Sequence, residues 1–149
     1  MFKLACFRNI ADGSLLGGRE QPEVRSLRHV LIIEDMYLFQ QYLTDIATLA
    51  GASSISAVGT QQDAIESARR HKPALILSDI KLPQGSGVSA IDTIVAAHGD
   101  IPVIFITGYP ERCDFFVDEG MLLTKPVSAE VLLKTVSAFF GGAPLPTRH

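Results

Sequence analysis

The segment ALILSD, residues 74–79, is a short apolar run that ends in an acid. A run of this length is typical of a strand buried on both faces, and such strands occur in parallel sheets. A second run, HVLIIED at residues 29–35, has the same form and ends in an acidic pair. Two buried strands that both end in carboxylates indicate a parallel sheet with charged groups at one edge.

Strand and helix patterns alternate outward from these two runs as far as Gly141. Apolar runs predict strands at residues 30–34, 54–58, 74–78, 102–106 and 121–123. Helical spacing predicts helices at residues 37–50, 61–71 and 88–98, and a last helix that begins near the N-cap residue Ser128 and stops at Gly141. We therefore expect an α/β fold with a doubly wound parallel sheet, helices on both faces, and a site at the carboxyl ends of the strands.

Composition limits the classes of function. The chain has 149 residues, 47% of them hydrophobic, which suffices for one domain with a core. The formal net charge is -3 and Lys and Arg form no run, so we expect no nucleic-acid partner. The start is a poor signal peptide, and no apolar run approaches the ~18 residues of a membrane span. The two cysteines form no metal-type pair with the four histidines. These features predict a soluble cytoplasmic protein without a membrane partner.

Three segments follow from the same patterns. Residues 1–27 show no sustained period and are interpreted as an N-terminal extension or arm, residues 28–141 as the folded domain, and residues 142–149 as a C-terminal tail. The histidines at 29, 71 and 98 have no evident partners in the sequence. We expect them to be structural or solvated.

Chemically useful side chains stand where the predicted strands end. Glu34 and Asp35 follow the first strand, Asp79 the third, Thr107 the fourth and Lys125 the fifth. Three carboxylates at one edge repel one another unless a cation is present, and oxygen ligands with open positions suit Mg2+. A hydroxyl and an ammonium at the same edge suit a phosphoryl group, and an aspartate can accept one as an acyl phosphate. The residues at the strand ends therefore predict a site that binds Mg2+ and accepts a phosphoryl group.

Four segments, HVLIIED, LILSDIKLP, PVIFITGYP and LLTKP, resemble in order the signature segments of response-regulator receiver domains of two-component systems. The resemblance covers about residues 29–140. It implies a flavodoxin-like sheet of five strands in order 2-1-3-4-5 with five helices. It also implies Asp79 as the phosphoacceptor and Mg2+ as the cofactor. The other residues that it implies are the metal ligands Asp35 and Lys81 (through its carbonyl), Glu34 acting through water, the switch hydroxyl Thr107, the phosphoryl-pairing Lys125, and a cis Lys125–Pro126 peptide that aims this lysine inward.

The segment FITGYPER is similar to the receivers of alphaproteobacterial general-stress-response regulators and to stand-alone receivers with a Phe-Ala-Thr-Gly-Tyr motif. Ile106 departs from the second motif, and 27 preceding residues are too few for the extra domain of the stress regulators, so we expect a single-domain member. Two further departures bear on output. Leu122 stands where receivers usually carry an aromatic switch residue, and the short spacing between Thr107 and Lys125 predicts a stunted or mobile fourth helix at residues 113–119.

We expect a signalling protein that catalyses only its own phosphorylation and dephosphorylation. Its predicted partners are a sensor histidine kinase, a downstream signalling or phosphotransfer protein, and a second copy of the chain, bound through the arm or the last helix. One alternative is a receiver-like module that docks or dimerises without phosphate. Another is a phosphatase of the haloacid-dehalogenase type, which needs a second acid two residues after its nucleophile, where this chain has Lys81.

Overall fold

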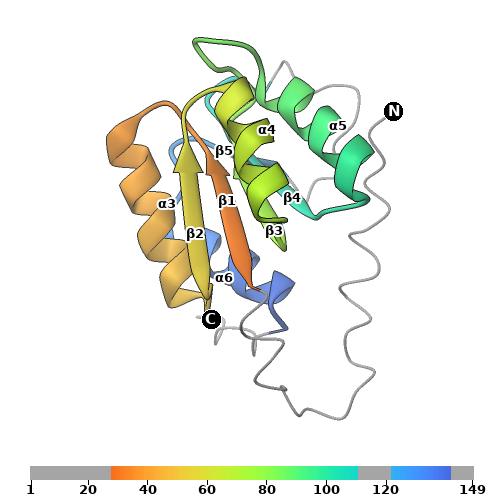
Figure 1. The fold of residues 1–149 in the computed structure, drawn as a ribbon. Helices are drawn as coiled ribbons and strands as arrows, with labels where there is room; N and C mark the ends of the chain where they lie inside the picture. The colour runs from red at the N-terminus through yellow and green to blue at the C-terminus, as the bar shows by residue number, and fades with distance from the viewer. Residues whose placement is uncertain (1–27, 111–121, 142–149) are drawn as a thin grey trace.

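The computed structural model describes residues 28–110 and 122–141. Strands and helices alternate along this part of the chain (Figure 1), in the order β1 (His29–Ile33), α3 (Tyr37–Leu49), β2 (Ser54–Val58), α4 (Gln61–Arg70), β3 (Leu75–Ser78), α5 (Gly87–His98), β4 (Val103–Thr107), β5 (Leu122–Thr124) and α6 (Ala129–Phe139).

The five strands form one parallel sheet in the order β2-β1-β3-β4-β5. This is the predicted order. Strands are added on one side of β1 to give β2 and then on its other side to give β3, so the strand order reverses between β1 and β3, where Ile33 pairs with Ser78. On the other side of β3, Ser78 pairs with Phe105, so the carboxyl ends of β1, β3 and β4 lie side by side. Strand-end residues therefore gather at the topological switch point, where open parallel sheets place their sites.

Helices cover both faces of the sheet, which explains why the central strands are apolar at almost every position (Figure 1). The residues of β1, β3 and β4 are all buried. Helices α4 and α5 pack on one face through Ala64, Ala68, Ala90, Ile91 and Ile94. Helices α3 and α6 pack on the other face through Leu43, Ile46, Ala47, Leu132 and Val136. The expectation of a doubly wound sheet is confirmed.

Three of the four described helices begin at a side-chain cap. The hydroxyl of Thr60 accepts a hydrogen bond from Asp63 N–H at the start of α4, and Ser128 accepts one from Val131 N–H at the start of α6, as predicted. Ser86 accepts hydrogen bonds from two N–H groups at the start of α5. Each cap satisfies a backbone donor that the helix itself leaves unpaired. The exception is α3, which begins after Met36 with no side-chain cap.

Several predicted strand boundaries differ from the structure by one residue. The first strand begins and ends one residue earlier than predicted, at His29 and Ile33, whereas β4 and β5 lie one residue later. The predicted arm, the predicted tail and the predicted stunted helix at 113–119 lie outside the described residues, and the domain boundaries stay a prediction. No helix within the described ranges is long and apolar enough to cross a membrane.

His29 is structural, as expected, and the structure shows partners for it that the sequence did not reveal. The buried His29 ring contacts the hydroxyl oxygens of Ser54 and Ser56 at 2.7 and 3.1 Å, and it stacks on the His71 ring with the centroids 3.8 Å apart. Burial, together with the nearby His71, lowers the pKa of His29. This pair lies at the start of β1, at the opposite end of the strand from the acids.

Candidate functional site

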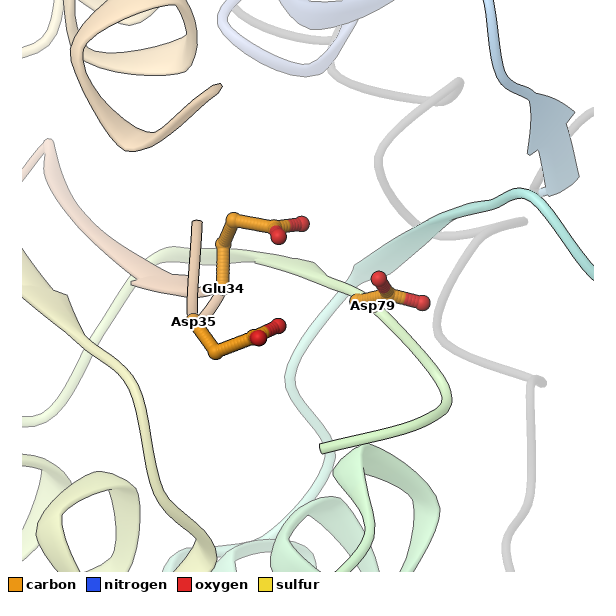
Figure 2. A group of neighbouring side chains, drawn as sticks. All are labelled: Glu34, Asp35 and Asp79. Atoms are coloured by element: carbon orange, nitrogen blue, oxygen red, sulfur yellow. The ribbon is translucent and has the colours of Figure 1, made fainter. Parts of the chain in front are cut away.

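Three carboxylates converge at the carboxyl edge of the sheet, as the sequence predicted (Figure 2). Glu34 and Asp35 directly follow β1, and Asp79 directly follows β3. Because these two strands are neighbours in register, the three side chains offer oxygens that lie within 4.8 Å of one another. Glu34 is buried, Asp79 is nearly so and Asp35 is exposed. The cluster therefore reaches from the protein interior to solvent.

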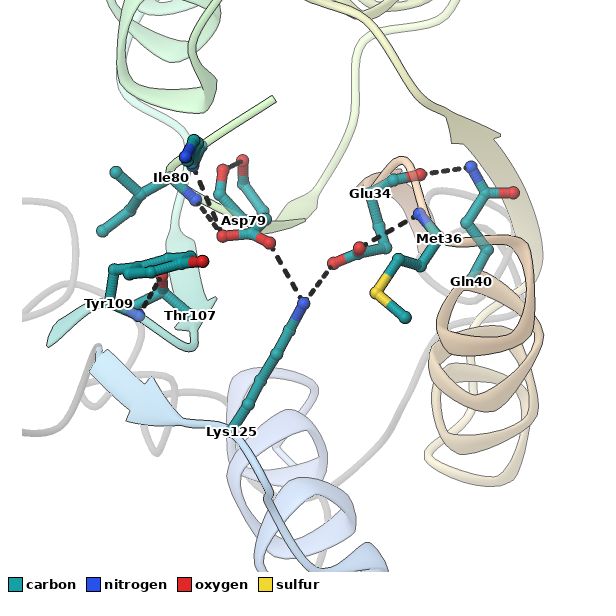
Figure 3. Close-up of polar contacts among 10 residues, drawn as sticks. Glu34, Met36, Gln40, Asp79, Ile80, Thr107, Tyr109 and Lys125 are labelled. Carbon is teal, nitrogen blue, oxygen red and sulfur yellow. Dashed lines mark hydrogen bonds and ion pairs between the residues drawn. The ribbon is translucent and has the colours of Figure 1, made fainter. Parts of the chain in front are cut away.

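Lys125 connects two of these acids (Figure 3). Its Nζ donates to Oε2 of Glu34 at 2.9 Å and to Oδ2 of Asp79 at 3.0 Å. The pairing of β4 with β5 places the lysine, because Thr107 pairs with Thr124 and the Lys125 N–H donates to the Thr107 carbonyl at 2.9 Å. The Lys125–Pro126 peptide is cis, as expected. In the described structure Lys125 is thus the counter-ion of two carboxylates.

The Asp79 carboxylate is held at both oxygens. Oδ1 accepts a hydrogen bond from Ile80 N–H at 2.7 Å and a longer one from Lys81 N–H at 3.4 Å, while Oδ2 faces Lys125 (Figure 3). The backbone carbonyl of Asp79 accepts from the Ser78 hydroxyl at 2.7 Å. The bonds to Oδ1 and Oδ2 fix the direction of the carboxylate.

Glu34 is enclosed by protein donors. Its Oε1 accepts from Met36 N–H at 3.1 Å, its Oε2 accepts from Lys125, and its backbone carbonyl accepts from the Gln40 side-chain amide (Figure 3). Burial raises the pKa of Glu34 even though the bonds from Lys125 and Met36 oppose the shift. Burial alone would lower the pKa of Lys125, but the pairs with Glu34 and Asp79 outweigh it and the pKa is raised. Burial has the larger effect on the pKa of Glu34, whose side chain is 1% exposed. The ion pairs have the larger effect on the pKa of Lys125, whose side chain is 20% exposed.

A cleft of about 360 Å3 opens above these groups. It is lined by Asp35, Met36, Asp79, Lys81, Leu82, Pro83, Gly108, Tyr109 and Lys125. At its rim the Lys81 ammonium stands 5.2 Å from the centre of the Tyr109 ring, a cation–π contact between the loops that follow β3 and β4. Thr107 is fully buried at the end of β4, and its hydroxyl accepts a hydrogen bond from Tyr109 N–H at 3.0 Å. Asp79 therefore lines a cleft that also carries Lys81, Tyr109 and Lys125.

The donor set fits a divalent magnesium ion. Three carboxylates and one ammonium leave two negative charges uncompensated within the cluster, and all the acidic ligand atoms are oxygens, which Mg2+ prefers. Both oxygens of Glu34 already have protein donors, which agrees with an indirect contact through water. The expected roles of the Lys81 carbonyl and the Thr107 hydroxyl stay predictions.

Several supporting residues were not identified from the sequence. Gln61 at the start of α4 accepts a hydrogen bond from Ser86 N–H at 3.0 Å and so ties the loop after Asp79 to the neighbouring helix. A Cβ atom on Gly87 would lie 1.8 Å from the Asp79 carbonyl oxygen, so only glycine allows α5 to begin this close to the acid. The glycine directly before the predicted helix at 88–98 is the sequence signal that could have identified this close approach.

Residues 30–137 match the response regulator receiver domain family, so the chain belongs to this family. It is 31% identical over 113 residues to the transcriptional regulatory protein PdtaR from Mycobacterium tuberculosis, covering 73% of this chain and 55% of that protein. It is 40% identical over 103 residues to the phyllosphere-induced regulator PhyR from Methylorubrum extorquens, covering 65% of this chain and 38% of the relative. The chain thus spans about half or less of the length of these relatives.

A solved structure supports the same assignment. The solution structure of the receiver domain of PhyR from Erythrobacter litoralis is similar with a TM-score of 0.69 and 35% identity, over 82% of this chain and 96% of that one. The resemblance to general-stress-response receivers expected from FITGYPER is therefore confirmed. The two relatives are named as regulators and not as enzymes.

Proposed function

We propose that this chain is a phosphorylatable signalling switch that accepts a phosphoryl group on Asp79 with Mg2+ as cofactor. The observation that carries the proposal is the position of the Asp79 carboxylate. It faces the cleft at the carboxyl end of β3, within reach of two further acids, with one oxygen 3.0 Å from the Lys125 ammonium. A nucleophile, a cation site and a fixed positive charge together meet the needs of phosphoryl transfer.

Each residue of the site has a separate role in the proposed phosphoryl transfer. An Asp79 oxygen forms a bond to phosphorus while the bond between phosphorus and the donor's leaving atom breaks. Lys125 stays beside Asp79 and balances negative charge on the transferred group, and Thr107 is the hydroxyl proposed to bind the same group after transfer. Asp35, Asp79 and the Lys81 carbonyl would hold Mg2+, with Glu34 acting through water. The metal would supply charge neutralisation at the phosphoryl oxygens.

The proposed donor is a sensor histidine kinase in the cytoplasm, and the proposed output is binding to a downstream signalling or phosphotransfer protein that depends on the phosphorylated state. Membership in the receiver family supports the donor.

A homodimer through α6 or residues 1–27 is also part of the proposal. Light scattering on the full chain and on a shortened chain that begins at Arg28 tests it. A dimer mass that survives the truncation would exclude residues 1–27 from the interface, and a dimer mass that is lost would assign the interface to them. A monomeric full chain would contradict the homodimer.

Incubation of the purified chain with acetyl phosphate, followed by intact-mass measurement, tests the proposed chemistry. One added phosphoryl group is expected when Mg2+ is present, and none when a chelator is present from the start of the incubation. A docking module that works without phosphate would gain no mass. A phosphatase would release inorganic phosphate through many turnovers, which the presence of Lys81 in place of the second acid argues against.

A further inference from the structure

Phe39 of α3 contacts the lysine of the site. The Lys125 ammonium lies 4.3 Å from the centre of the Phe39 ring, a distance within the range of cation–π contacts. Phe39 is partly buried and packs against the core between the sheet and helices α3 and α6. Its ring is therefore held in place from behind while it faces the lysine.

A second aromatic residue of the same helix holds the backbone that follows the lysine. The Tyr42 hydroxyl donates a hydrogen bond to the Val127 carbonyl at 3.1 Å. Phe39 and Tyr42 are three residues apart, so they share a face of α3, and their ring centres are 5.6 Å apart. The two rings thus reach from α3 to both the side chain of Lys125 and the chain two residues beyond it.

We propose that Phe39 and Tyr42 are positioning residues that keep the Lys125 ammonium at the phosphoryl site. The inference deepens the function proposed above and rests on it. Lysine carries its charge on a flexible four-carbon stem, so its position depends on its contacts. The contact of the ammonium with Asp79 changes when that carboxylate is phosphorylated, and its other acidic partner, Glu34, belongs to the metal cluster. Phe39, by contrast, is neither a member of the metal cluster nor a reacting group.

The experiment compares four variants of the full chain for the rate of labelling by acetyl phosphate at saturating Mg2+. Phe39→Leu removes the ring but keeps an apolar side chain, and Phe39→Tyr keeps the ring. Tyr42→Phe removes only the hydroxyl. Phe139→Leu is the matched packing control, because Phe139 packs against the same core at the far end of α6. Thermal midpoints and Mg2+ dissociation constants are measured for each variant.

Phe39→Leu is expected to slow labelling about three- to fivefold, the effect of losing one cation–π contact, with Mg2+ affinity unchanged. Tyr42→Phe is expected to slow it about threefold, whereas Phe39→Tyr and Phe139→Leu label at the parent rate. Labelling of Phe39→Leu at the parent rate, or equal slowing by Phe139→Leu, would overturn the inference.

If the proposed function itself is wrong, the parent protein will not be labelled by acetyl phosphate. In that case NMR of the Lys125 side-chain methylene groups in the metal-free protein decides the positioning claim. Resonances shifted by the ring current in the parent and in Phe39→Tyr, and unshifted in Phe39→Leu, support it. Resonances that are the same in all three proteins contradict it.

Discussion

The Gly87→Ala substitution is expected to disturb the phosphoacceptor without touching a charged group. Gly87 is the first residue of α5, and its N–H donates to the Ile80 carbonyl at 2.9 Å. An added Cβ would lie 1.8 Å from the Asp79 carbonyl oxygen and 2.5 Å from the Ser78 hydroxyl oxygen. Either α5 or the backbone of Asp79 must move to admit the methyl group.

The size of that movement follows from the geometry. The Cβ and the carbonyl oxygen must separate by a further 1.2 Å to reach even 3.0 Å, below which real Cβ atoms essentially never come. Helix α5 cannot retreat freely, because Ser86 caps it and the Ser86 N–H is bonded to Gln61. Overpacking of this kind costs about 2 kcal/mol of unfolding free energy, and a displacement of about 1 Å at a reacting group slows transfer up to about a hundredfold.

The assay combines thermal unfolding with the rate of acetyl phosphate labelling. For a domain of this size we expect the midpoint of Gly87→Ala to fall by about 8 °C and labelling to slow by at least about tenfold. Gly108→Ala is the matched control, because it adds the same methyl group beside the cleft, where nothing lies within 4 Å. A Gly87→Ala protein with the parent's midpoint and labelling rate would refute the close approach of α5 to Asp79.

Three further predictions follow from the site. Asp35→Ala should weaken Mg2+ binding measured by fluorescence or calorimetric titration, and an unchanged affinity would remove Asp35 from the metal ligands. Tyr109→Ala should shorten the lifetime of the acyl phosphate up to about tenfold at saturating Mg2+, because the ring at the cleft rim shields the phosphoryl group from water; an unchanged lifetime with weaker partner binding would indicate a docking role instead. The pKa of Lys125 is raised in the folded state, so its ion pairs stabilise the fold fully below the unfolded value of about 10.4, and this stabilisation is lost as the pH rises through the folded pKa. Urea unfolding should therefore show a steeper alkaline loss of stability in the parent than in Lys125→Met, and parallel curves would contradict the raised pKa.

The fold could be predicted because the central strands are buried on both faces. Every residue of β1, β3 and β4 is buried, so the sequence must be largely apolar there, and short apolar runs separated by helical patterns are readily recognised. The strand ends were less certain, because hydrophobicity does not mark the first and last hydrogen bond of a ladder. This explains the one-residue differences at His29 and Thr107.

The acids and the lysine of the site could be predicted for a related reason. Parallel strands in register bring their carboxyl ends together, so a residue's position after its strand suffices to place it. The contacts of Phe39, Tyr42 and Gln61 could not be predicted this way. They depend on side-chain direction and join residues far apart in the chain, such as Tyr42 and Val127, which are 85 positions apart. The sequence alone carries no signal for such pairs beyond the shared helix face of Phe39 and Tyr42.

Locating the phosphoryl group on the chain tests the central claim most directly. The protein is labelled with acetyl phosphate and Mg2+, the acyl phosphate is reduced with borohydride, which converts a phosphorylated aspartate to homoserine, and the peptides are sequenced by mass spectrometry. We expect homoserine at position 79 and nowhere else, and no label in Asp79→Asn, whose thermal midpoint is expected to match that of the parent. Homoserine at position 35, or a label that persists in a folded Asp79→Asn protein, would contradict the assignment of Asp79 as the phosphoacceptor.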